Sequence, residues 1–129
     1  MSNSDPWTGV SSDVIGRFLD VQITKRSFAR RTRAAYRIDL QRLDRWMQQT
    51  VQRTAITADV TDLRRYFSKY LPAGCSSWTV KRARSSARRF YAFLRDCHYR
   101  DDDPMACLTG ASLSPDIEPL VERRLEAAA

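Results

Sequence analysis

The stretch of sequence that decides the fold is residues 77–94, which read SWTVKRARSSARRFYAFL. Apolar side chains recur in this stretch every three or four positions, which places them on one side of an α-helix. The apolar stripe consists of Val80, Ala83, Ala87, Phe90, Tyr91 and Leu94. Ser76 or Ser77 is suited to cap the start of the helix. We expect the helix to end near His98, before a break at residues 101–104.

Three upstream stretches share this helical periodicity. The first begins after a cap at Ser12 or Asp13, the second runs from about Ala29 to Thr50, and the third follows a cap at Asp59 or Thr61. Their apolar sets are Val14, Ile15, Phe18 and Leu19; Tyr36, Leu40, Leu43, Trp46 and Met47; and Leu63, Phe67, Tyr70 and Leu71, before a stop at Pro72. With a turn at residues 105–108, the sequence predicts an all-α fold, a compact bundle of four main helices plus a short C-terminal turn.

Length and composition indicate one soluble domain. The chain has 129 residues, 43% of them hydrophobic, and no apolar run near the ~20 residues that a membrane span needs. Its N-terminus lacks the pattern of a secretory signal, so we expect a cytoplasmic protein with no membrane partner. Three cysteines and one histidine provide neither a disulfide framework nor a zinc site, and we expect no cofactor and no metal.

Basic residues are concentrated in the middle of the chain. From Lys25 to Arg89 there are 17 Lys and Arg against four Asp, a net charge of +13. The two flanks hold five basic and 11 acidic residues, a net charge of −6. This distribution favours a surface that binds a polyanion, although a solvated basic surface that serves solubility is an alternative.

The cations of residues 77–94 lie opposite the apolar stripe when the sequence is projected at about 100° per residue. They are Lys81, Arg82, Arg84, Arg88 and Arg89, and the stretch contains no acidic residue. Solvated helix faces usually mix the two signs, and like charges four positions apart destabilise a helix. A second ridge on the preceding long helix consists of Arg30, Arg33, Arg37 and Gln41. The charge pattern therefore favours contact with nucleic acid phosphates.

Several motifs resemble a known family. Thr32-x-x-x-Tyr36-x-x-Asp39-Leu40-x-x-Leu43-x-x-Trp46 resembles the signature of the core-binding, SAM-like domain of tyrosine recombinases, which include phage integrases and Xer-type recombinases. The motifs Asp62-Leu63-x-x-Tyr66-Phe67, Thr79-x-x-Arg82-x-x-Ser85-x-x-Arg88-x-Phe90-Tyr91 and Asp103-Pro104 follow in the family's order. The resemblance covers about residues 14–108 and is closest to Xer-like members. Arg84 departs from it, because the family usually has an apolar residue there.

The resemblance implies a DNA-binding domain that forms one half of a clamp around the duplex, with its second and fourth helices at the major groove. In this family the catalytic Arg, His and Tyr lie in a C-terminal domain, so the chain is expected to bind DNA without cleaving it. Its tyrosines (Tyr36, Tyr66, Tyr70, Tyr91 and Tyr99) are interpreted as structural. The implied partners are double-stranded DNA and other recombinase protomers in a synaptic complex. The isolated domain is expected to be monomeric or weakly self-associating.

The predicted organisation is a flexible N-terminal tail over residues 1–11, the core-binding domain over 12–108, and a linker from 109. Residues 113–118 resemble the start of the family's catalytic domain, and the end of the chain is either that start or a cloning-derived tail. Thr32 and Thr79 lie near helix starts, where they suit either a cap or a phosphate contact. The predicted DNA contacts are Arg30, Thr32, Arg33, Arg37, Thr79, Lys81, Arg82, Ser85, Arg88 and Arg89.

Other functions remain open from the sequence. A helix-turn-helix regulator needs a compact helix pair with a tight turn, which these long helices do not suggest. A stand-alone protein–protein interaction module and an accessory protein of the excisionase type also fit a small helical bundle. Salt-dependent binding to duplex DNA separates the interaction module from a DNA-binding domain.

Overall fold

The computed structural model describes residues 5–23 and 30–108, and this part of the chain is all-α, as predicted. Its main helices are α1 (Ser11–Phe18), α2 (Arg30–Trp46), α3 (Val60–Arg65), α4 (Leu71–Gly74) and α5 (Ser77–Asp96). Shorter π or 3-10 segments are η1 (Leu19–Ile23), η2 (Met47–Val51), η3 (Ala55–Thr57), η4 (Tyr66–Tyr70) and η5 (Pro104–Cys107). Since η1, η2 and η4 directly continue their neighbours, the four predicted helical stretches are confirmed.

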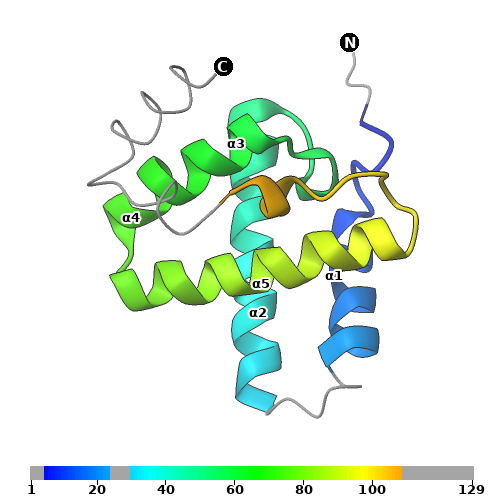
Figure 1. The fold of residues 1–129 in the computed structure, drawn as a ribbon, viewed down its shortest axis with the longest axis horizontal. Helices are drawn as coiled ribbons and strands as arrows, with labels where there is room; N and C mark the ends of the chain where they lie inside the picture. Colours follow the sequence, from blue (N-terminus) through cyan, green and yellow to red (C-terminus); the bar gives the residue numbers. More distant parts are fainter. Residues whose placement is uncertain (1–4, 24–29, 109–129) are drawn as a thin grey trace.

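The long helices α2 and α5 cross at the centre of the domain (Figure 1). All six predicted apolar residues of α5 are buried, with at most 7% of each exposed. Phe18 of α1 meets Phe90 of α5 edge to face at 5.5 Å, and this contact joins α1 to the crossing. The predicted turn at the end of the domain is η5, whose Met105 is buried against the same core.

Tyr70 is the exception among the predicted core residues, because half of it is exposed. It lies in η4, a π-helical segment, where the period is longer than in the α-helix on which the prediction was based. Tyr66 occupies the core position instead, and Tyr70 stacks on it from outside at 5.5 Å. The prediction that Tyr70 is buried was therefore wrong.

Two of the predicted helix starts are confirmed. Asp59 caps α3 in a capping box with Asp62, and Ser76 caps α5 by accepting a hydrogen bond from the backbone N–H of Thr79 at 3.2 Å. The prediction for α1 was wrong, because this helix begins at Ser11 after Val10, which makes no side-chain cap. The hydroxyl of Ser11 donates instead to the buried carboxylate of Asp44, at 2.7 Å.

The predicted stop at Pro72 was also wrong. The chain stays helical to Gly74, because Pro72 falls in the first turn of α4, where a missing N–H costs little. The long helix ends at Asp96, and His98 follows it with a left-handed φ of 65°. The backbone N–H of Tyr99 then donates to the carbonyl of Leu94 at 2.8 Å, which closes the helix.

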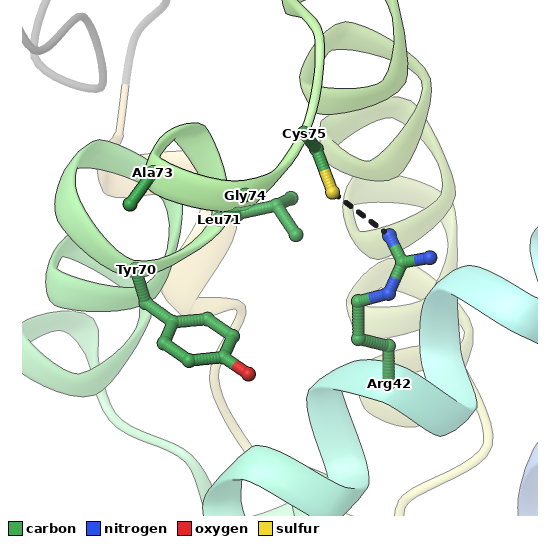
Figure 2. A pocket seen from close by; sticks show the side chains of 6 residues that line it. All are labelled: Arg42, Tyr70, Leu71, Ala73, Gly74 and Cys75. Atoms are coloured by element: carbon green, nitrogen blue, oxygen red, sulfur yellow. Dashed lines mark hydrogen bonds between the residues drawn. The ribbon is translucent and has the colours of Figure 1, made fainter.

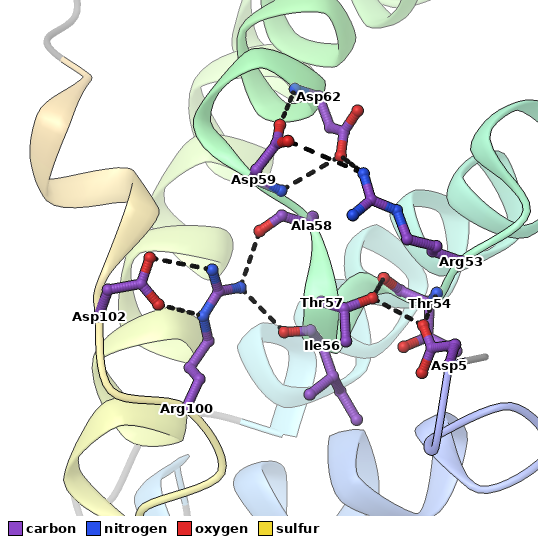
Figure 3. A network of polar contacts seen from close by, with 10 residues as sticks. All are labelled: Asp5, Arg53, Thr54, Ile56, Thr57, Ala58, Asp59, Asp62, Arg100 and Asp102. Carbon is purple, nitrogen blue, oxygen red and sulfur yellow. Dashed lines mark hydrogen bonds and ion pairs between the residues drawn. The ribbon is translucent and has the colours of Figure 1, made fainter.

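The connection between α2 and α3 is held by side chains from several directions (Figure 3). Arg100 donates to the carbonyls of Ile56 and Ala58 at 2.9 and 2.8 Å, and Asp102 holds its guanidinium at 2.7 Å. Asp44 accepts a hydrogen bond from the backbone N–H of Ala55 at 2.8 Å. These bonds tie α2 to both α3 and the end of α5.

Residues 5–10 belong to the stretch predicted to be a flexible tail, and Asp5 is bonded to this connection. Asp5 accepts hydrogen bonds from the backbone N–H of Thr54 at 2.7 Å and from the hydroxyl of Thr57 at 2.6 Å (Figure 3). Burial opposes ionisation of Asp5, but these hydrogen bonds outweigh it and hold the pKa of Asp5 below its usual value. The ring of Trp7 meets Tyr99 at 5.3 Å.

The predictions for residues 1–4, for Ala29 as the start of the second helix and for residues 109–129 concern residues outside the described part of the chain. Within residues 5–23 and 30–108, no helix combines the length and the apolar character needed to cross a lipid bilayer.

Candidate nucleic-acid interface

The side of α5 that points away from the core is basic. Lys81, Arg88 and Arg89 are exposed, while Arg84 and Ser85 are half-buried. Burial lowers the pKa of the Arg84 guanidinium, and the nearby charge of Arg88 acts in the same direction. From Ser77 to Leu94 this helix contains no acidic residue that could offset the five cations. The side of α5 that carries Lys81, Ser85, Arg88 and Arg89 is called the basic face below.

Arg82 joins α5 to α2. Its Nε and Nη2 donate to the two carboxylate oxygens of Asp39, at 3.0 and 2.8 Å. The side chain of Asp39 is 1% exposed and that of Arg82 is 32% exposed, so the carboxylate is buried under the guanidinium. The hydrogen bond to Asp39 raises the pKa of Arg82 further. This bidentate pair fixes the crossing of the two helices and offsets the charge of Arg82.

Arg33 also has a carboxylate partner within the domain. It pairs with Asp20 of η1, on the side of α2 that packs towards α1. Arg33 and Asp39 are six positions apart, which places them about 120° apart around α2. By the same projection Arg30 and Arg37 lie still further round from Asp39, at about 160–180°. The ridge predicted on α2 and the edge of α2 that meets Arg82 are thus different sides of this helix.

Arg42 is the cation of α2 that faces the start of α5, and it is not among the DNA contacts predicted from the sequence. Its Nη1 donates to the Sγ atom of Cys75 at 3.4 Å, directly before the Ser76 cap (Figure 2). The two residues line an open hollow of about 480 Å³, together with Tyr70, Leu71, Ala73 and Gly74. Arg31 is exposed and lies eleven positions before Arg42, which puts both on nearly the same side of α2.

The two candidate threonines lie near helix starts, as predicted. Thr79 is the third residue of α5, and both its backbone N–H and its hydroxyl are engaged with Ser76, at 3.2 and 3.1 Å. Thr79 therefore completes the cap that Ser76 makes. Thr32 is the third residue of α2 and is half-buried.

The fold and the basic face together define a class of protein. This class is a small all-α domain that is built on the crossing of two long helices and carries a basic surface. The family model described as phage integrase, N-terminal SAM-like domain matches residues 15–98, from α1 to the end of α5. The chain therefore belongs to this family, and the resemblance noted in the sequence is confirmed.

Several curated relatives are Xer tyrosine recombinases. XerD of Pasteurella multocida is 31% identical over 102 residues, which cover 79% of this chain and 34% of the relative. XerD of Proteus mirabilis is 30% identical over 114 residues, covering 88% and 36%. XerC of Chromobacterium violaceum is 39% identical over 77 residues, covering 60% and 25%. The chain thus spans about a third of the length of the first of these relatives. No solved structure gives a significant match.

Proposed function

We propose that the chain binds double-stranded DNA as the core-binding domain of a site-specific tyrosine recombinase, and forms one half of a clamp on the recombination site. The observation that carries this proposal is the basic face of α5, where Lys81, Arg88 and Arg89 are exposed on a helix that contains no acidic residue from Ser77 to Leu94. Membership of the phage integrase family supports it, because its Xer relatives are tyrosine recombinases.

Electrostatics supports a phosphate ligand for the basic face. Lys81 and Arg88 are exposed, and neither forms an ion pair with a residue that the structure describes. Cations that neutralise phosphates release counterions from DNA, which gives an affinity that falls steeply with salt. An arginine on this face is also able to bind the O6 and N7 atoms of guanine with two hydrogen bonds, which would add sequence specificity.

The ten predicted contacts do not have equal support. Lys81, Ser85, Arg88 and Arg89 share the basic face, and we assign the main DNA contact to them. Arg82 and Arg33 have carboxylate partners, so we assign to them the positioning of α2 against its neighbours. Arg30 and Arg37 lie on the side of α2 away from Asp39, where they would reach the DNA backbone beyond the helix crossing. Thr32 is seven positions before Asp39 and therefore lies on nearly the same side of α2 as Asp39.

The proposal assigns the cleavage chemistry to parts of a longer recombinase. The relatives are about three times as long as the matched region, which leaves room for a catalytic domain that closes the other half of the clamp. Other recombinase protomers would then assemble with this domain in a synaptic complex on two DNA sites.

Charge reversal on the basic face tests the proposal. The double variant Lys81→Glu/Arg88→Glu should weaken binding to a DNA duplex at least about tenfold in low salt, and the salt slope of log K should fall by roughly two. Helicity should stay unchanged because both side chains are exposed. Fluorescence anisotropy of a labelled duplex measures the affinity, and circular dichroism measures the helicity.

A matched control separates a local contact from a change in net charge. Arg17→Glu/Lys69→Glu makes the same change in net charge at exposed positions on α1 and η4. We expect this control to bind DNA more tightly than the α5 variant. Equal losses in the two variants, or unchanged binding in the α5 variant, would show that the basic face of α5 is not the contact surface.

A further inference from the structure

Trp78 is the most exposed of the large hydrophobic side chains described in residues 5–23 and 30–108. It is 72% exposed, against 52% for Ile38 and 50% for Tyr70. The other two tryptophans pack into the domain, since Trp46 is 6% exposed and Trp7 packs against the core. The exposed indole of Trp78 has no structural role in the core.

The position of Trp78 places it beside the cations of α5. It precedes Lys81 by three residues, Ser85 by seven and Arg89 by eleven, and each of these spacings returns to the same side of a helix. It also lies one turn before Arg82, which binds Asp39 of α2. An apolar ring is thus set into the basic face, in the first turn of α5.

The surrounding charge favours one kind of partner for this ring. A second copy of the same face would bring cations against cations, which opposes self-association through this surface. Duplex DNA offers what the face lacks, namely phosphates for the cations and apolar groups within its grooves. In the major groove the apolar group is the C5-methyl of thymine, which protein side chains contact directly.

We propose that Trp78 enters the groove of bound DNA and packs against thymine C5-methyl groups, which makes it a specificity-determining residue of the interface. Its indole N–H is then able to donate to an acceptor on a base edge or a phosphate. This inference rests on the proposed function, because it assigns an apolar contact to the same basic face.

Truncation of the ring separates this contact from the ionic ones. Trp78→Ala should weaken duplex binding about tenfold and leave the salt slope of log K unchanged, since no charge is removed. Lys81→Gln, one turn away, should lower that slope by about 0.9 instead. Trp78→Phe should restore most of the affinity because it keeps an aromatic ring. All three variants should have the same melting temperature as the wild type, since Trp78 and Lys81 are both exposed.

Removal of the methyl groups from the DNA tests the contact itself. An alternating A·T duplex and the same duplex with uracil in place of thymine differ only in these methyls. The wild type should bind the thymine duplex more tightly by roughly fourfold for each methyl contacted. For Trp78→Ala this preference should disappear, because the ring that reads the methyl is gone.

The outcomes distinguish the two proposals. If the wild type shows no salt-dependent binding to any duplex, the proposed function fails and the Trp78 contact fails with it. If the wild type binds but Trp78→Ala keeps the same affinity and the same thymine preference, the Trp78 contact is overturned while the proposed function stands. If Trp78→Ala alters only self-association in sedimentation velocity, the ring belongs to a protein interface and the DNA contact is again overturned.

Discussion

Replacing Arg82 by alanine is expected to lower the free energy of unfolding by about 3 kcal/mol. The side chain of Asp39 is 1% exposed, and its two hydrogen bonds to the guanidinium of Arg82 would be lost. A buried carboxylate without a partner is strongly destabilising, and the effect lies at the lower end of the usual range because Arg82 is itself 32% exposed. Urea unfolding followed by circular dichroism measures the change.

Two further variants control this prediction. Lys81→Ala removes an exposed cation next to Arg82 and should change the stability by no more than about 0.5 kcal/mol. The double variant Asp39→Ala/Arg82→Ala should lose less free energy of unfolding than the two single variants lose in sum, because it leaves no unpaired charge. An Arg82→Ala variant as stable as Lys81→Ala would contradict the role of this pair in joining α2 to α5.

Replacing Phe90 by alanine is expected to lower the free energy of unfolding by about 3–5 kcal/mol. Phe90 is fully buried, and its ring meets Phe18 at 5.5 Å and Tyr91 at 5.3 Å. Its truncation leaves a cavity where α1 and α5 pack together, and well-packed neighbours relax only partly into such a space. Thermal and urea unfolding of the variant measure the loss.

An apolar truncation outside the core provides the comparison for Phe90. Ile38 is 52% exposed on α2, so Ile38→Ala should have little effect on stability, within about 0.5 kcal/mol. Leu40, two residues further on and 1% exposed, should behave like Phe90 and lose about 2–5 kcal/mol on truncation to alanine. Equal stability of the Ile38 and Leu40 variants would mean that the helix faces are assigned wrongly.

The helices and most of their buried faces were predictable because burial in a helix repeats with the period of the sequence. Phe90 and Leu40 follow from this period alone, and the caps at Asp59 and Ser76 follow from residue types that bond free N–H groups. Tyr70 was not predictable in this way, because the π-helical η4 changes the period locally. The bonds of Asp5 reach Thr54 and Thr57, far along the chain, and no local pattern indicates them.

The candidate site was predictable in part. The basic face of α5 follows from the spacing of its cations, whereas the partners of these cations depend on how the helices pack. Asp39 and Arg82 are 43 positions apart, so their pairing appears only when α2 and α5 are in place. Arg42 shows the same limit, since it faces α5 through a contact with Cys75. Trp78 shares the spacing of the cations, but its exposure is visible only in the structure.

The most direct test of the central claim, that the basic face of α5 contacts DNA, is a titration of the ¹⁵N-labelled chain with a DNA duplex, followed by amide chemical shifts. The largest saturable changes should fall between Trp78 and Arg89, with a change at the indole N–H of Trp78, and they should weaken as salt is added. Saturable changes confined to α1 and η5, or spectra that no duplex alters, would contradict the claim.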